Sequence, residues 1–154
     1  PASLKWPNDL MANDRKMGGV LLEADGPHAI LGCGINIKNA PKISDSLVST
    51  TDIAEYQSVL PDAKQLADCY LLNLENLYQI WQECGPAPLL ARWQDKSNII
   101  GRNLTVQIRD RSITGICDAL EPDGRLNIID IDGNVHLITV GDVVLMGEVN
   151  ATNN

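Results

Sequence analysis

One long amphipathic segment, residues 62–85, separates two stretches of short strands, and this order constrains the fold more than any other feature of the sequence. Asp62 can cap a helix and Gln65 stands three residues later, which is the spacing of a capping box, while Gly85-Pro86 ends the segment. Apolar residues recur every three or four positions and form one stripe: Leu66, Tyr70, Leu74, Leu77 and Trp81. The pattern predicts a helix whose apolar stripe packs in the core against a sheet.

Short strands are predicted on the N-terminal side of this helix. Apolar runs at residues 9–12, 17–22 and 29–35 alternate with turn-forming residues, which is the pattern of an antiparallel strand meander. Residues 38–61 are polar and contain a cluster of Ser and Thr. We therefore expect a long irregular connection there, with a short helix near residues 53–56.

The C-terminal side predicts a second part made of strands. After a short helix expected over residues 88–95, apolar runs are separated by turns rich in Asp, Gly and Asn. The expected strands cover residues 104–108, 113–119, 126–130, 135–139 and 143–146. Strands this short and evenly spaced are typical of a small barrel. We predict an α+β protein with a boundary near residues 99–102, where no long linker separates the parts, so we expect them to pack together.

The composition excludes several classes of protein. The chain has 154 residues, of which 44% are hydrophobic and 21% charged, as in globular proteins large enough to bury a core. No apolar run approaches the roughly 18 residues of a membrane span, and no charged-then-apolar leader opens the chain, so we expect a cytoplasmic protein without a membrane partner. A net charge of −8 argues against a nucleic-acid partner.

The cysteines do not have the spacing of a metal site. The four of them are far apart and form no Cys-x-x-Cys pair, and only His28 and His136 could complete a ligand set. We therefore expect no zinc site. Because a free cysteine behaves as a small hydrophobe, we interpret these residues as buried reduced thiols.

Three segments near the N-terminus concentrate groups that can bind a charged ligand. Lys5-Trp6-Pro7-Asn8-Asp9 brings a cation, an amide and a carboxylate around a proline that fixes a turn. Lys16 precedes Met17-Gly18-Gly19-Val20, and a hairpin at residues 13–15 could return Lys16 toward the first segment. Gly32-Cys33-Gly34-Ile35-Asn36 offers bare backbone followed by an amide. The glycines match neither a P-loop nor a dinucleotide-binding fingerprint, since both need further glycines.

In this order, the three segments resemble the characteristic run of the biotin protein ligase (holocarboxylase synthetase) family, which is K-W-P-N-D, then R/K-K-x-x-G-x-L-x-E, then G-x-G-x-N. Residues 15–23 match the middle pattern. The predicted barrel is similar to the SH3-like domain that ends these ligases. The resemblance implies that residues 1–99 are the C-terminal part of a class II synthetase-like catalytic domain, with a mixed sheet and packed helices. Residues 100–150 would form an SH3-like barrel, and residues 151–154 would be a tail.

The resemblance implies a biotin-binding role for three residues. Lys16 matches the catalytic lysine that contacts the biotin carboxylate and the α-phosphate of ATP, where a compact cation stabilises developing charge. Gly19 and Gly34 match glycines where biotin lies close to the backbone.

The resemblance also implies an ATP end of the site. Asn8, Asp9 and Asn36 match residues there, and Asp9 would be the carboxylate beside a magnesium ion, which prefers oxygen ligands. Four further residues would support the site: Lys5, Trp6, Gly18 and Gly32.

The implied reaction has two steps. Biotin attacks the α-phosphate of ATP to form biotinyl-adenylate and pyrophosphate, and a lysine of a biotin carboxyl carrier domain then attacks the mixed anhydride and releases AMP. The protein contributes positioning and charge stabilisation without a covalent enzyme intermediate. The implied ligands are biotin, ATP and Mg²⁺, and the implied partners are the carrier domain and a second copy in a homodimer.

Two features depart from the family pattern. The loop G-R-G-R-x-G-R, which lies upstream of K-W-P-N-D and covers the adenylate, is not in this sequence, and Pro1 stands where an initiator Met would be. We therefore expect a piece of a longer protein, with little or no ligase activity as an isolated chain. Met146 stands where bacterial members often place charged residues near the nucleotide, so we expect the barrel to serve packing or acceptor docking.

Two other interpretations stay open at this point. The chain could be a non-catalytic module that resembles a biotin ligase and binds a partner such as a carrier domain. It could also be a relative of the lipoate or octanoate transferases, which share the fold and a catalytic lysine. The K-W-P-N-D spelling favours the biotin branch, and competition between biotin and lipoate for binding would separate the two acyl classes.

Overall fold

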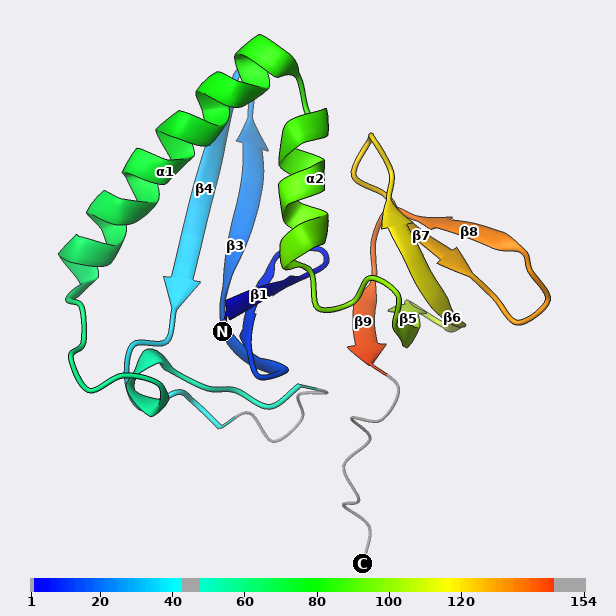
Figure 1. The fold of residues 1–154 in the computed structure, drawn as a ribbon, viewed down its shortest axis with the longest axis horizontal. Helices are drawn as coiled ribbons and strands as arrows, with labels where there is room; N and C mark the ends of the chain where they lie inside the picture. Colours follow the sequence, from blue (N-terminus) through cyan, green and yellow to red (C-terminus); the bar gives the residue numbers. More distant parts are fainter. Residues whose placement is uncertain (1, 43–47, 146–154) are drawn as a thin grey trace, which may run out of the picture.

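The computed structural model describes residues 2–42 and 48–145, which form two sheets joined by a pair of helices (Figure 1). The N-terminal sheet has the order β1-β2-β3-β4, with antiparallel pairing throughout. Its strands are β1 Ala2–Lys5, β2 Asp9–Ala12, β3 Arg15–Asp25 and β4 His28–Ile35. The predicted meander is confirmed, and β1 is a strand that the apolar pattern did not predict. Parallel pairing within residues 2–42 and 48–145 is limited to isolated bridges, one of which joins Lys16 to Thr50.

The turn between β2 and β3 explains how the chain reverses next to the predicted site. Asn13 and Asp14 both have positive φ, at 49° and 58°, as a tight hairpin of matching twist requires. Asn and Asp tolerate this conformation better than other residues with a side chain. The reversal pairs Asp9 with Gly19 across the two strands. Residues that are ten apart in the sequence therefore become neighbours.

The helices begin and end close to where the sequence predicts. A short 3-10 helix, η1, covers Ile53–Glu55, and α1 and α2 cover Ala63–Cys84 and Ala87–Lys96. Both arms of the capping box form at the start of α1, because Gln65 N donates to Asp62 Oδ1 over 2.7 Å and Asp62 N donates to Gln65 Oε1 over 2.9 Å. No helix in the described residues is both long enough and apolar enough to span a membrane.

The predicted burial of the apolar stripe of α1 is wrong for the described structure. No α1 side chain is fully buried, and Trp81 is 50% exposed. Leu66 and Tyr70 face β4 across an apolar cavity of about 220 Å³ that Cys33 also lines. Periodicity identifies which face of a helix is apolar, but it does not identify which other elements pack against that face.

The second sheet confirms the strands predicted after residue 101. Its order is β8-β7-β6-β5-β9, so β8 and β9 are its two edges, and the described residues form an open sheet rather than a closed barrel (Figure 1). The strands are β5 Asn103–Ile108, β6 Arg111–Leu120, β7 Leu126–Ile129, β8 Val135–Ile138 and β9 Asp142–Leu145.

The main buried core lies in this second sheet and reaches into the first. Apolar side chains from β5, β6, β7, β8 and β9 pack with Ile99 and with Trp6, which belongs to the turn after β1. The indole Nε1 of Trp6 donates to the carbonyl oxygen of Gly124 over 3.1 Å. The expectation that the two parts pack together is confirmed, while the exact division into domains stays a prediction.

The expectation of buried thiols is wrong for three of the four cysteines. Cys33, Cys69 and Cys84 are exposed, and Cys117 is buried. Burial raises the pKa of the Cys117 thiol to about 12, so that thiol stays protonated. The exposed cysteines lie on β4 and α1, where the described structure leaves apolar surface uncovered, and sequence alone does not reveal this.

Candidate functional site

The floor of the site is made of glycine backbone. Gly19 of β3 and Gly34 of β4 are direct partners across the ladder, so their Cα–H groups face the same side of the sheet. A Cβ on Gly34 would meet no atom within 4 Å, whereas one on Gly19 would lie 3.3 Å from the carbonyl oxygen of Asn8. The pair leaves a strip of bare backbone to which a flat ligand can come close.

An open cavity of about 670 Å³ lies over this strip. It brings together the following predicted site residues: Asn8, Lys16, Gly18, Gly19, Gly32, Gly34 and Asn36. Its volume lies within the range of small-molecule sites. The three sequence segments therefore converge on one cavity, as their order along the chain suggested.

Among the described residues, Lys16 is the charged side chain that lines the cavity, and Asp9, which does not line it, pairs with the Lys16 ammonium. The Lys16 ammonium makes an ion pair with Oδ1 of Asp9, and its side chain is 42% exposed. Lys5 approaches the other oxygen of the same carboxylate, with its Nζ 3.9 Å from Oδ2, and its side chain is 5% exposed. Asp9 thus lies between two lysines, one buried and one open to the cavity. The accessible ammonium is the group that can meet an anionic ligand.

The two predicted amides are already partly committed to the fold. Asn8 Nδ2 donates to the carbonyl of Val20 over 2.7 Å, and Val20 N donates back to the carbonyl of Asn8 over 3.0 Å, which ties the turn to β3. Asn36 N donates to the carbonyl of Met17 over 2.8 Å, and its Nδ2 donates to the carbonyl of Thr51 over 3.0 Å. Both residues line the cavity with side chains held in a defined direction.

Trp6, which the sequence placed among supporting residues, does not line the cavity in the described structure. It is 5% exposed and packs in the core of the second sheet. Its effect on the site is therefore indirect, because it anchors the turn that carries Asn8 and Asp9. Met146, expected to stand near the nucleotide in place of a charged residue, lies outside the described residues.

Sequence reasoning predicted the short helix near residues 53–56 but did not assign residues 48–56 to the site. Thr50 and Pro41 line the cavity, and Thr51 and Asp52 are buried beside it. The sequence shows a polar stretch there, which was interpreted as an irregular connection. The available signal was Asp52 followed by Glu55, because Asp52 Oδ1 accepts from Glu55 N over 3.2 Å as a helix cap.

Curated relatives and solved structures of this chain name the same kind of protein. No family model matches the sequence. The chain is 32% identical to the biotin–[acetyl-CoA-carboxylase] ligase of Mycobacterium tuberculosis over 142 residues, which cover 92% of this chain and 52% of that protein. It is 30% identical to the bifunctional ligase/repressor BirA of Escherichia coli, with 92% of this chain and 46% of the relative covered. The chain thus spans about half the length of these curated relatives.

Solved structures give the same result at the level of the fold. The crystal structure of biotin protein ligase from Aquifex aeolicus matches with a TM-score of 0.80 at 25% identity, covering 94% of this chain and 64% of that one. The same enzyme in complex with biotin and ATP matches with a TM-score of 0.79 at 25% identity, covering 94% of this chain and 62% of that one. In sequence and in fold, this chain corresponds to the C-terminal part of the biotin protein ligase family.

Proposed function

We propose that this chain supplies the lysine, amide and glycine-backbone part of a biotin protein ligase active site. The observation that carries the proposal is the convergence on one cavity of Asn8, Asn36, the Gly19–Gly34 strip and Lys16, whose ammonium pairs with Asp9. One relative is named a biotin–[acetyl-CoA-carboxylase] ligase, another a bifunctional ligase/repressor, and one structural neighbour is a complex with biotin and ATP. The reaction would form biotinyl-adenylate from biotin and ATP and then pass biotin to a carrier lysine.

Lys16 would act on the charged atoms of this reaction. Its ammonium is open to the cavity and is oriented by Asp9. A cation fixed in this way stabilises the negative charge of the biotin carboxylate and of the α-phosphate as the new P–O bond forms and pyrophosphate leaves. The protein would thus lower the barrier by holding both reactants and their charge in place, with no covalent intermediate.

The glycine strip would take biotin and the amide end would take the nucleotide. Gly19 and Gly34 would let biotin lie against the backbone of β3 and β4, with Gly32 in support, while Asn8 and Asn36 would contact ATP. Magnesium enters the proposal as an ion carried by the phosphates, since Mg²⁺ keeps several waters and takes one or two protein carboxylates. Asp9 would be that carboxylate, and it would then release one of its lysine partners.

The acceptor in this proposal is a biotin carboxyl carrier domain in the cytoplasm. Its lysine amine would attack the carbonyl carbon of the adenylate, form the amide bond and expel AMP. The only chemistry required of the acceptor is an unprotonated amine close to the anhydride, which the ligase would have to position.

Binding of a non-hydrolysable biotinyl-adenylate analogue, measured by isothermal titration calorimetry, tests the proposal. The unaltered chain should bind the analogue, and biotin should compete while lipoate should not. Lys16→Ala should lower the affinity by roughly tenfold to a hundredfold, the loss expected for a hydrogen-bonded charge. Lys64→Ala is the matched control, because Lys64 lies on the exposed face of α1 in a surface ion pair with Asp68.

Catalysis needs a second measurement. The exchange of labelled pyrophosphate into ATP should depend on biotin when the chain is mixed with the part of the Mycobacterium tuberculosis relative that it does not cover. Equal affinity of Lys16→Ala and the unaltered chain would contradict the proposed role of Lys16. The absence of any analogue binding would contradict the function as a whole.

A further inference from the structure

A single buried residue bonds to both Lys16 and Asn36. Thr51 is fully buried, and its backbone N–H donates to the carbonyl oxygen of Lys16 over 2.9 Å. Its own carbonyl oxygen accepts from Nδ2 of Asn36 over 3.0 Å. The N–H of Lys16 donates to the carbonyl of Ser49 over 2.8 Å, so both backbone polar groups of Lys16 pair with the same segment. The lysine of β3 and the amide beyond β4 are thus joined through Thr51.

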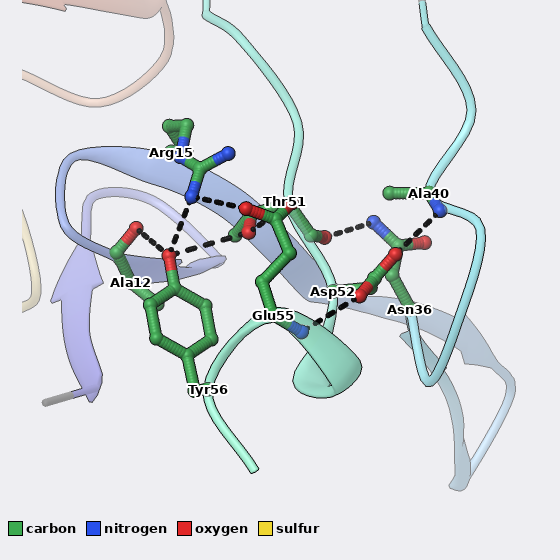
Figure 2. Close-up of polar contacts among 8 residues, drawn as sticks. All are labelled: Ala12, Arg15, Asn36, Ala40, Thr51, Asp52, Glu55 and Tyr56. Atoms are coloured by element: carbon green, nitrogen blue, oxygen red, sulfur yellow. Dashed lines mark hydrogen bonds and ion pairs between the residues drawn. The ribbon is translucent and has the colours of Figure 1, made fainter. Parts of the chain in front are cut away.

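The side chain of Thr51 is anchored by a polar cluster (Figure 2). Its hydroxyl donates to Oε1 of Glu55 over 2.9 Å and lies 3.2 Å from the Tyr56 hydroxyl. Arg15 Nη2 donates to Oε2 of Glu55 over 2.6 Å and to the Tyr56 hydroxyl over 3.0 Å. The Tyr56 hydroxyl donates to the carbonyl of Ala12 over 3.2 Å. Because Arg15 directly precedes Lys16, the cluster closes a ring from β3 through Glu55 to Thr51 and back to β3.

The ionisation of Arg15 and Glu55 strengthens the hydrogen bond between them. The hydrogen bond from Arg15, followed by that from Thr51, lowers the pKa of the Glu55 carboxyl below its ordinary value. The same contact with Glu55 raises the pKa of Arg15. Glu55 and Arg15 are therefore both ionised at neutral pH, and hydrogen bonds between charged groups are shorter and stronger than neutral ones.

Asp52 holds the other side of the same segment. Its Oδ2 accepts from Ala40 N over 2.8 Å and its Oδ1 accepts from Glu55 N over 3.2 Å. Ile53 N also donates to the carbonyl of Asn36 over 3.0 Å. The chain that follows Asn36 is thus fixed onto the segment that fixes Lys16.

We propose that Thr51 is a positioning residue for Lys16 and Asn36, held in place by Glu55 and Arg15. Thr51 touches no ligand in this proposal and acts through the two residues that do. A ligand that contacts both Lys16 and Asn36 binds best when their separation is set before it arrives, since ordering them on binding would reduce the affinity. The inference deepens the proposed function and rests on it, because it assigns a role toward the same ligand.

Thr51→Val tests the inference, since it removes the hydroxyl and keeps the size of the side chain. Nuclear magnetic resonance of the labelled chain should show that the backbone amide of Thr51 exchanges with solvent roughly tenfold faster, and that the side-chain amide resonance of Asn36 shifts. Affinity for the biotinyl-adenylate analogue should fall roughly tenfold. Thr51→Ser, which retains the hydroxyl, should restore all three measurements. Thr114→Val is the matched control, because Thr114 is exposed on β6 and pairs with Thr105.

Glu55→Gln is the second variant and keeps the test valid if Thr51→Val does not fold. Glu55 is partly exposed, and glutamine keeps its size while removing its charge. The same three quantities should change in the same direction. An unchanged Asn36 resonance with unchanged analogue affinity in both variants would overturn the positioning role. Failure of the unaltered chain to bind the analogue would instead contradict the proposed function. The exchange rate of the Thr51 amide and the Asn36 resonance would then still test whether the Thr51 side chain holds this segment in place.

Discussion

Gly18 and Gly34, two glycines at the site, differ in the space available for a side chain. Gly18 has no room for a side chain, because a Cβ there would collide with the carbonyl oxygen of Gly34 and lie 3.2 Å from the Cα of Ile35. Gly34 has room, since its Cβ would meet nothing within 4 Å. One glycine is therefore required by the fold, and the other is required only if something must lie against its backbone.

Alanine at each position separates these two reasons. Gly18→Ala should reduce the free energy of unfolding by about 1–3 kcal/mol, because the strands must move apart to admit the methyl group. Gly34→Ala should leave that free energy within about 0.5 kcal/mol of the unaltered chain, as for an open surface position. It should instead weaken binding of the biotinyl-adenylate analogue by roughly tenfold. Urea unfolding gives the free energy of unfolding and calorimetry gives the affinity. A loss of stability without a loss of affinity in Gly34→Ala would show that the analogue does not bind against Gly34.

At the scale of elements, α1 is stabilised by interactions within the helix more than by packing against other elements. No residue of it is fully buried, and Tyr78 and Trp81 pack edge to face on each other with ring centroids 5.7 Å apart. Interactions between residues close in sequence must therefore contribute much of the stability of this helix. The capping box at Asp62 is the strongest of those that the structure describes.

Removal of this cap should be measurable. Asp62→Ala deletes the side chain that accepts from Gln65 N, and we expect a loss of about 1 kcal/mol with reduced helicity by circular dichroism. Asp68→Ala is the control, because its exposed pair with Lys64 should contribute less than about 0.5 kcal/mol. Equal losses in the two variants would mean that the cap does not limit the stability of α1.

At the scale of the whole molecule, the turn that carries Asn8 and Asp9 is anchored in the second sheet. Trp6 contributes its indole to that core and bonds to Gly124 through Nε1. Hydrogen bonds from Asn98 and Arg102 to Asp14, of 3.0 and 3.1 Å, also tie the β2–β3 turn to the junction before β5. The second sheet therefore supports the two turns beside the site, and none of its described residues lines the cavity.

Trp6 variants should reveal this coupling. Trp6→Ala should cost about 3–5 kcal/mol of stability, the usual loss for a buried aromatic. Trp6→Phe should cost about 2 kcal/mol, less than alanine, because a phenyl ring fills part of the site while the bond to Gly124 and some buried volume are lost. Trp81→Ala is the control, since Trp81 is half exposed, and its effect should be much smaller. Urea unfolding followed by circular dichroism measures all three, and a Trp81 loss as large as that of Trp6 would contradict this account of the core.

The sequence by itself determined the helices, every described strand except β1, and most of the candidate site. Alternation, the Asn13-Asp14 turn and the Asp62–Gln65 spacing act over a few residues, so the pattern alone predicts them. The site segments lie on neighbouring strands of one meander, and for that reason their convergence also follows from local order.

Only the tertiary structure decided how those parts meet. It brought Thr51 back to Lys16 and Asn36, and it put Trp6 in the core of the other sheet. It also left the apolar stripe of α1 largely uncovered in the described residues. Each of these depends on contacts between residues distant in the chain, and the apolar or polar character of a residue does not specify which distant partner it will meet.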